Sequence, residues 1–316
     1  MKIKGAKSSF EDVWKWSLTL FVFFLLFCML KNPAKYISTS LDGISAWAFN
    51  VLPAVLPFMF FTRILSSTSA IEKMAKPFSK ATNFLFRTPP ISLPTFLLAI
   101  LSGYPVGSKL VVNLYEQGKI SQNEAFKMSS FCSTSGPMFI VGAVGVGMFH
   151  STKIGYILFA SHIFGAIFCG ICFRFFKMKN EKHLTIQNET KASFDLSEIV
   201  LNSTLSILMV GCIICVFFII IEVLSPAFNL LPEPLNFFLQ GVVEITKGSL
   251  SLSTYSNVKI AIILTSFVIS FGGISTLLQS FAMLTKIKMP FALFALQKTM
   301  HGIFSCIVTI LLLSFF

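Results

Sequence analysis

The chain has 316 residues, of which 54% are hydrophobic and only 12% are charged, and its formal net charge is +12. A soluble domain is normally about one quarter charged, so this composition excludes an ordinary water-soluble globular protein. The lysines and arginines lie in short stretches between apolar runs, as in the loops of a multi-pass membrane protein. That distribution predicts a lipid bilayer as the partner and argues against nucleic acid.

Seven apolar stretches approach or exceed the roughly 20 residues that cross a bilayer. The first, Trp16–Leu30, follows a basic stretch and is not followed by a small-residue cleavage site, so we expect a retained accessory helix rather than a secretory signal. The other six crossings are expected near residues 44–65, 129–149, 154–176, 199–224, 257–284 and 290–316. The predicted fold class is an all-α integral membrane protein of the plasma (inner) membrane.

Two further apolar stretches, 91–108 and 234–251, are interrupted where a lipid-facing helix should be continuous. The first contains Leu101-Ser-Gly-Tyr-Pro-Val-Gly-Ser-Lys109 and the second contains Gly241-Val-Val-Glu-Ile-Thr-Lys-Gly248. Lipid tolerates such breaks only where protein or a water-filled cavity covers the freed backbone groups. Both stretches are therefore predicted to be re-entrant hairpins.

The chain divides into two similar halves around one long polar stretch. Residues 1–43 form a tail with the accessory helix, 44–176 a first repeat, 177–198 a cytoplasmic linker and 199–316 a second repeat. Each half has the order helix, interrupted hairpin, helix with a polar Ser/Gly centre, helix. Because three crossings is an odd number, the second repeat should be inverted relative to the first.

A weak internal match accompanies this order of elements. Ser130–Gly136 aligns without gaps on Ser266–Gly272, and at nearly the same offset Gly103 falls on Gly241. The loop cations fall on one side if the crossings are counted as above, which places the N terminus in the cytoplasm and the C terminus outside.

Polar residues inside the apolar runs are the candidates for a solute site, because hydroxyls, amides and unwound backbone can bind a substrate at mid-membrane depth. The candidate residues are Gly103, Tyr104, Pro105, Gly107, Lys109, Ser133, Thr134, Ser135, Gly136, Glu244, Thr246, Ser270, Gly272, Gly273, Ser275 and Gln279.

Other interpretations of these residues stay open. Small residues also pack helices together in membranes, and Lys109 could reach the cytoplasmic surface by snorkelling. Glu244, a candidate proton carrier, could instead pair with Lys247 or lie at the surface.

No catalytic constellation is visible, so an enzyme is not expected. The four histidines are scattered, and neither a HExxH motif nor a Walker-type phosphate loop is present. Cys169-x-x-Cys172 and Cys212-x-x-Cys215 are interpreted as helix-packing residues rather than metal ligands, and no cofactor is expected.

Six motifs in this order and spacing resemble the YlbJ-type sporulation integral membrane proteins of the nucleoside-recognition (Gate) group, over roughly residues 44–316. They are Leu52-Pro-Ala-Val-Leu-Pro-Phe58, Leu101–Leu110, Glu116-x-Gly-Lys-Ile-Ser121, Ser130-Phe-Cys-x-x-Ser-Gly-Pro-Met-Phe-Ile140, Gly241–Gly248 and Ser270-Phe-Gly-Gly-Ile-Ser275 with Gln279. The resemblance implies a transporter-like membrane protein with a role in spore formation if the organism forms spores.

Two functions are therefore weighed. The first is a permease for a small polar solute, with nucleoside-like and ionic solutes among the candidates. The second is a non-transporting membrane scaffold or assembly factor for the envelope or spore. The sequence leaves the oligomeric state open.

Overall fold

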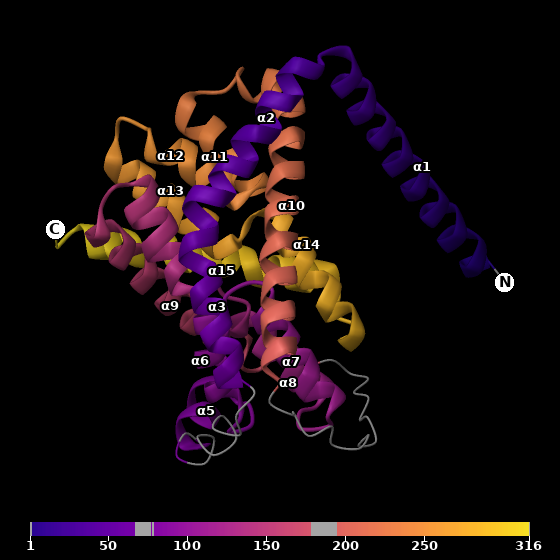
Figure 1. Cartoon of the computed structure of the whole chain (residues 1–316). Helices are drawn as coiled ribbons and strands as arrows, with labels where there is room; N and C mark the ends of the chain where they lie inside the picture. Colours follow the sequence, from indigo (N-terminus) through magenta and orange to yellow (C-terminus); the bar gives the residue numbers. More distant parts are fainter. Residues whose placement is uncertain (1, 67–76, 78, 178–194, 316) are drawn as a thin grey trace.

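The computed structural model describes residues 2–66, 77, 79–177 and 195–315, and these residues form helices joined by short loops, without strands (Figure 1). In chain order the elements are α1 Lys2–Lys31, α2 Pro33–Ala46, π-helical η1 Trp47–Val51, α3 Leu52–Ser66, α5 Ser79–Phe86, α6 Ser92–Ser102, α7 Val106–Glu116, α8 Gln122–Cys132, π-helical η3 Met138–Met148, α9 Thr152–Phe173, α10 Leu196–Phe228, α11 Glu233–Val243, α12 Ile245–Ser253, α13 Val258–Phe271, α14 Gly273–Leu284, 3₁₀-helical η4 Thr285–Ile287 and α15 Phe291–Leu313.

Five helices are long and apolar enough to span a membrane, judged by length and composition within the described residues. They are Pro33–Leu65, Thr152–Phe173, Leu196–Phe228, Val258–Ile287 and Phe291–Leu313. The all-helical membrane fold is thus confirmed, whereas the count of seven crossings stays a prediction. Most of the predicted linker, residues 178–194, lies outside the described residues.

The N-terminal region contains more helix than expected. The accessory helix α1 begins at Lys2 rather than Trp16, and α2 begins at Pro33, although the sequence predicted no element between residues 31 and 43. Asn32 caps α2 by accepting a hydrogen bond from the Lys35 N–H, and proline at the first helical position fits because its missing N–H would have had no intrahelical partner. Figure 1 shows α1 pointing away from the other helices.

Both interrupted stretches form helical hairpins, as predicted. The first is α6–α7 and the second α11–α12, and Figure 1 shows them toward opposite ends of α10. In the second hairpin the helices approach closely enough that a Cβ at Gly248 would collide with the backbone of Gly241. Gly103 lies at the break of the first hairpin, whereas the second hairpin breaks at Glu244, three residues after Gly241.

The two Ser/Gly centres interrupt their helices, also as predicted. Between α8 and η3 the chain is non-helical at residues 133–136, and α13 gives way to α14 at Gly272. Pro137 explains the first interruption because proline cannot donate the next backbone hydrogen bond. Gly272 and Gly273 explain the second, since their φ angles of +93° and +70° are ones that favour glycine.

The last helix of the first half, α9, packs against the last helix of the second half, α15. α9 and α15 approach so closely at Gly165 that a Cβ there would collide with Ser305. Small residues allow this contact, as is common between helices in membranes. Side chains of both helices bind the first interrupted helix, because His162 of α9 accepts from the Ser135 N–H and Lys298 of α15 donates to the Ser133 carbonyl.

Candidate functional site

The four interruptions of the chain lie together in pairs. At Gly103 the backbone of the first hairpin contacts the first broken helix, because a Cβ there would lie 2.8 Å from the Gly136 nitrogen. Gly103 has φ 71° and ψ −171°, a conformation that is essentially restricted to glycine. At Gly273 the second broken helix contacts the second hairpin, since a Cβ there would lie 3.0 Å from the Ile245 nitrogen.

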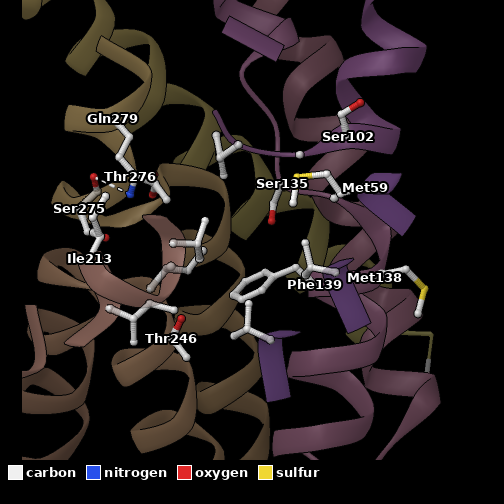
Figure 2. A pocket seen from close by; sticks show the side chains of 18 of the residues that line it. Met59, Ser102, Ser135, Met138, Phe139, Ile213, Thr246, Ser275, Thr276 and Gln279 are labelled. Carbon is white, nitrogen blue, oxygen red and sulfur yellow. Dashed lines mark hydrogen bonds between the residues drawn. The ribbon is translucent and has the colours of Figure 1, made fainter. Parts of the chain in front are cut away.

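A pocket lies where these pairs meet. Its empty volume is about 710 Å³, a value that includes the solvent-filled space at its opening. Both hairpin tips and both broken helices contribute to it, and apolar side chains of α3 and α10 complete the wall. Figure 2 shows Ser275, Thr276 and Gln279 on one side of the pocket and Ser135 and Phe139 on the other.

The first interruption leaves a backbone carbonyl without its helical donor, and a lysine distant in the sequence donates a hydrogen bond to it. In a continuous helix the Ser133 carbonyl would accept from the N–H of residue 137, but that residue is proline and has none. The Lys298 ammonium of α15 donates to this carbonyl instead, at 2.7 Å, and also donates to the Tyr104 hydroxyl at 2.5 Å.

The second interruption is satisfied in a similar way from the first hairpin. The turn at Gly272 removes the Ser270 carbonyl from its helical partner, and the Tyr104 hydroxyl donates to that carbonyl at 3.2 Å. Tyr104 therefore links the tip of one hairpin to the broken helix of the other half. Without such partners the freed carbonyls would be costly in a region that excludes water.

Glu244 is buried, with 1% of its surface exposed, and lines the pocket. Its backbone is extended at the break of the second hairpin, and its carboxylate accepts the Lys247 N–H at 2.7 Å, which caps α12. The alternative of a side-chain ion pair is not what the structure has, because the Lys247 ammonium lies 5.1 Å from the centre of the Phe218 ring. The carboxylate thus has both a structural role and access to the pocket.

The predicted site residues divide into those that line the pocket and those that do not. Lining it are Gly103, Tyr104, Ser135, Gly136, Glu244, Thr246, Ser275 and Gln279. Three polar candidates, Ser133, Thr134 and Ser270, are buried but do not line the pocket. Gly272 and Gly273 form the turn between α13 and α14, and Pro105 follows a cis peptide bond after Tyr104. Gly107 packs against the Cys132 carbonyl, and Lys109 is exposed.

Among the lining residues that the structure describes, two neighbouring hydroxyls of α14 have no protein partner. The oxygens of Ser275 and Thr276 are buried without a hydrogen bond, although the Gln279 amide donates to the Ser275 carbonyl at 3.3 Å beside them. Buried hydroxyls normally find a partner, so these two are available to a bound polar solute. The sequence predicted Ser275 and Gln279 for this role.

The sequence did not single out Lys298, and the expectation that the histidines are scattered was wrong for two of them. His162 of α9 and His301 of α15 lie with ring centres 4.6 Å apart, and both are fully buried. One signal was available, because Lys298 is the only charged residue in the apolar helix Phe291–Leu313.

Within the described residues, no three His, Cys, Asp or Glu side chains gather in a way that could hold a metal ion. All seven cysteines are free thiols.

Comparison with known proteins places this pocket in context. A family described as "Gate: Nucleoside recognition" matches residues 48–152, which include the first hairpin and the first broken helix. The chain is 28% identical to the "Sporulation integral membrane protein YlbJ" of Bacillus subtilis (strain 168), over 92% of this chain and 81% of the relative. No solved structure matches it. These two matches confirm the resemblance to YlbJ-type membrane proteins with a Gate nucleoside-recognition domain.

Proposed function

We propose that this protein is a permease that binds a small polar solute in the pocket between the two hairpins. The observation that carries the proposal is the convergence of both hairpin tips and both broken helices on one pocket, with the Ser275 and Thr276 hydroxyls left without protein partners. Discontinuous helices that meet around a site near the midplane are typical of secondary transporters.

We further propose that residues 44–176 and 199–316 are inverted repeats, with seven crossings and two re-entrant hairpins. The same order of elements in both halves supports this, as does the position of the hairpins toward opposite ends of α10. Arg87 and Arg174 lie over the same Phe175 ring, so the loop cations before α6 and after α9 lie on one side of the fold. If that side is cytoplasmic, as the positive-inside rule expects, the N terminus is cytoplasmic and the C terminus external.

The lining favours a solute with an apolar face and a few hydrogen-bonding groups. Val55, Phe58 and Ile213 contribute apolar surface, whereas Ser135, Thr276 and Gln279 contribute hydroxyls and an amide. Mostly apolar pockets with a few placed polar groups are typical of small-molecule sites. A nucleoside-like solute fits this lining and agrees with the description of the matching family. A role in spore formation, if the organism forms spores, follows from the name of the relative.

The test is an uptake screen in proteoliposomes with labelled nucleosides, metal cations and small anions. For the solute that is taken up, Thr276→Val and Gln279→Leu should each raise KM about fivefold to tenfold, the effect of one lost hydrogen bond. Thr299→Val is the control, because that hydroxyl bonds the Ala295 carbonyl on α15 and does not line the pocket. Absence of uptake for every class, or wild-type KM in both pocket variants, would contradict the proposal.

The alternative of a non-transporting membrane scaffold has one observation in its favour. The helix α1 projects away from the other helices in Figure 1. Its apolar side chains are exposed, Trp16 by 69% and Leu30 by 79%. Such a helix can contact lipid or a partner helix. Removing residues 2–31 should leave uptake intact if the protein is a permease and abolish assembly if it is a scaffold.

A further inference from the structure

A cluster of buried titratable side chains lies behind the pocket and joins the interrupted segments. Lys298 is 1% exposed, and His162 and His301 are fully buried. The Lys298 ammonium donates to the Tyr104 hydroxyl and the Ser133 carbonyl and lies 3.3 Å from His301 Nδ1. The cluster therefore connects the first hairpin, both broken helices, α9 and α15.

The partners of the two imidazoles fix where their protons lie. The Ser135 N–H can only donate, so His162 Nε2 accepts from it at 2.9 Å, and His162 Nδ1 carries the proton that it donates to the Ser270 hydroxyl. The His162 carbonyl can only accept, so His301 Nε2 carries a proton and donates to it at 2.9 Å. With Lys298 protonated and donating, His301 Nδ1 accepts from it with a lone pair, and both rings are neutral.

The protonated lysine uses every one of its donors. An ammonium has three N–H groups, and its three neighbours are the Tyr104 hydroxyl, the Ser133 carbonyl and His301 Nδ1. All three are neutral, and no carboxylate of the described residues lies within ion-pair distance of Lys298. The cluster thus holds one excess proton without a counter-charge, which is costly in a buried site.

Few other titratable groups face this proton. From the packed elements they are Tyr104 of the first hairpin, His162 and Cys169 of α9 and His301 of α15 itself. α14 has no titratable side chain, and α13 has only Lys259 in its first turn. α8, which also packs on α15, carries Glu124, Lys127 and Cys132. The thiol of Cys169 is engaged with the Gln297 carbonyl at 3.3 Å.

Loss of the proton would change the hydrogen bonds at the pocket wall. When one Nζ–H bond breaks and its proton leaves to water, the neutral amine has two donors for three acceptors and gains a lone pair. The Tyr104 hydroxyl can then donate to that lone pair, but only by releasing the Ser270 carbonyl, its present acceptor. That exchange of acceptors breaks the link from the first hairpin to the second broken helix.

We propose that Lys298, together with His301, is a proton-binding site whose protonation holds the first hairpin against the second broken helix, so that proton release loosens the pocket. The proposal rests on the proposed function in that it names the proton as the coupling ion of the same pocket.

The test is hydrogen–deuterium exchange of the full chain in lipid nanodiscs across a pH series, corrected for the intrinsic pH dependence of exchange and with no solute added. Peptides that contain the Gly107 amide of the first hairpin and the Gly272 amide of the second broken helix lie on the two sides of this link. They should lose protection about fivefold to tenfold as the pH rises, the effect of one broken hydrogen bond. In Lys298→Met the same peptides should have the low protection at every pH.

Lys127→Met is the matched control, because Lys127 is also buried and donates to a backbone carbonyl, that of Arg87. It should keep the wild-type pH profile. Tyr104→Phe supplies a second variant if Lys298→Met does not fold, and it should lower protection at acidic pH toward the alkaline level.

Constant protection of the wild type at all pH values would overturn the proposal without any variant. An unchanged pH profile in Lys298→Met would also overturn it, and loss of the profile in Glu244→Gln alone would assign the proton to Glu244. Since no solute is present, a failed exchange test leaves the uptake proposal standing, and a failed uptake screen leaves the proton site standing.

Discussion

Pro137 and Lys298 act on the same backbone carbonyl, that of Ser133, although they are far apart in the chain. The proline removes the donor that would have bonded the Ser133 carbonyl, and the lysine replaces it. The sequence could predict the first half of this arrangement, because the chemistry of proline is local. It could not predict the second half, since the partner comes from tertiary packing. The same limit applies to His162 and His301, which are far apart in the chain and are brought together only by the packing of α9 against α15.

Glu244 gives a prediction that separates its two roles. Glu244→Gln keeps an oxygen that can accept the Lys247 N–H, so the cap of α12 and the thermal unfolding midpoint should be nearly unchanged. Glu244→Ala loses the cap and should lower the stability by about 1 kcal/mol. If the charge serves the pocket, both variants should lose uptake. Wild-type uptake by Glu244→Gln would limit Glu244 to capping.

At the scale of helices, apolar runs and their interruptions predicted most of the elements. Glycine and proline in 91–108 and 234–251 indicated the hairpins, and the Ser/Gly centres indicated the broken helices, because all of these signals act within a few residues. The helix α2 was missed since its residues are mixed in polarity. The π-helical geometry of Met138–Met148 was not predicted either.

The close contact in the second hairpin predicts a large difference between two glycines. A Cβ at Gly248 would collide with the Gly241 backbone, which cannot move aside without separating α11 from α12. Gly248→Ala should therefore destabilise the protein by about 3 kcal/mol, at the upper end of the usual cost of overpacking. Gly142→Ala is the milder control, because its Cβ would meet the Ala54 side chain at 3.3 Å. Thermal unfolding in detergent measures both, and equal midpoints would contradict the packing argument.

At the scale of the whole molecule, composition predicted the membrane class, and the order of elements predicted two similar halves around a linker. The pocket could be predicted only in outline. Its polar residues lie at the interruptions, which the sequence reveals, whereas the apolar wall from α3 and α10 depends on how helices from the two halves pack.

The inverted arrangement predicts that the two hairpins begin on opposite sides of the membrane. A cysteine at Glu116, at the end of α7, should react with an impermeant maleimide only from the cytoplasmic side, and one at Thr254, after α12, only from outside. Mass spectrometry of the peptides separates these products from the exposed native Cys172 and Cys212. Reaction of both introduced cysteines from one side would rule out inversion.

The glycine contacts determine which parts of the molecule can move separately. Gly103 joins the first hairpin to the first broken helix, and Gly273 joins the second broken helix to the second hairpin, in each case backbone against backbone. No side chain in these contacts can rotate to take up a displacement, so each hairpin and its broken helix should shift as one rigid piece. The bond between the Tyr104 hydroxyl and the Ser270 carbonyl crosses from one piece to the other through a side chain, which can exchange partners. A transport cycle would therefore part the molecule along that boundary rather than within either piece.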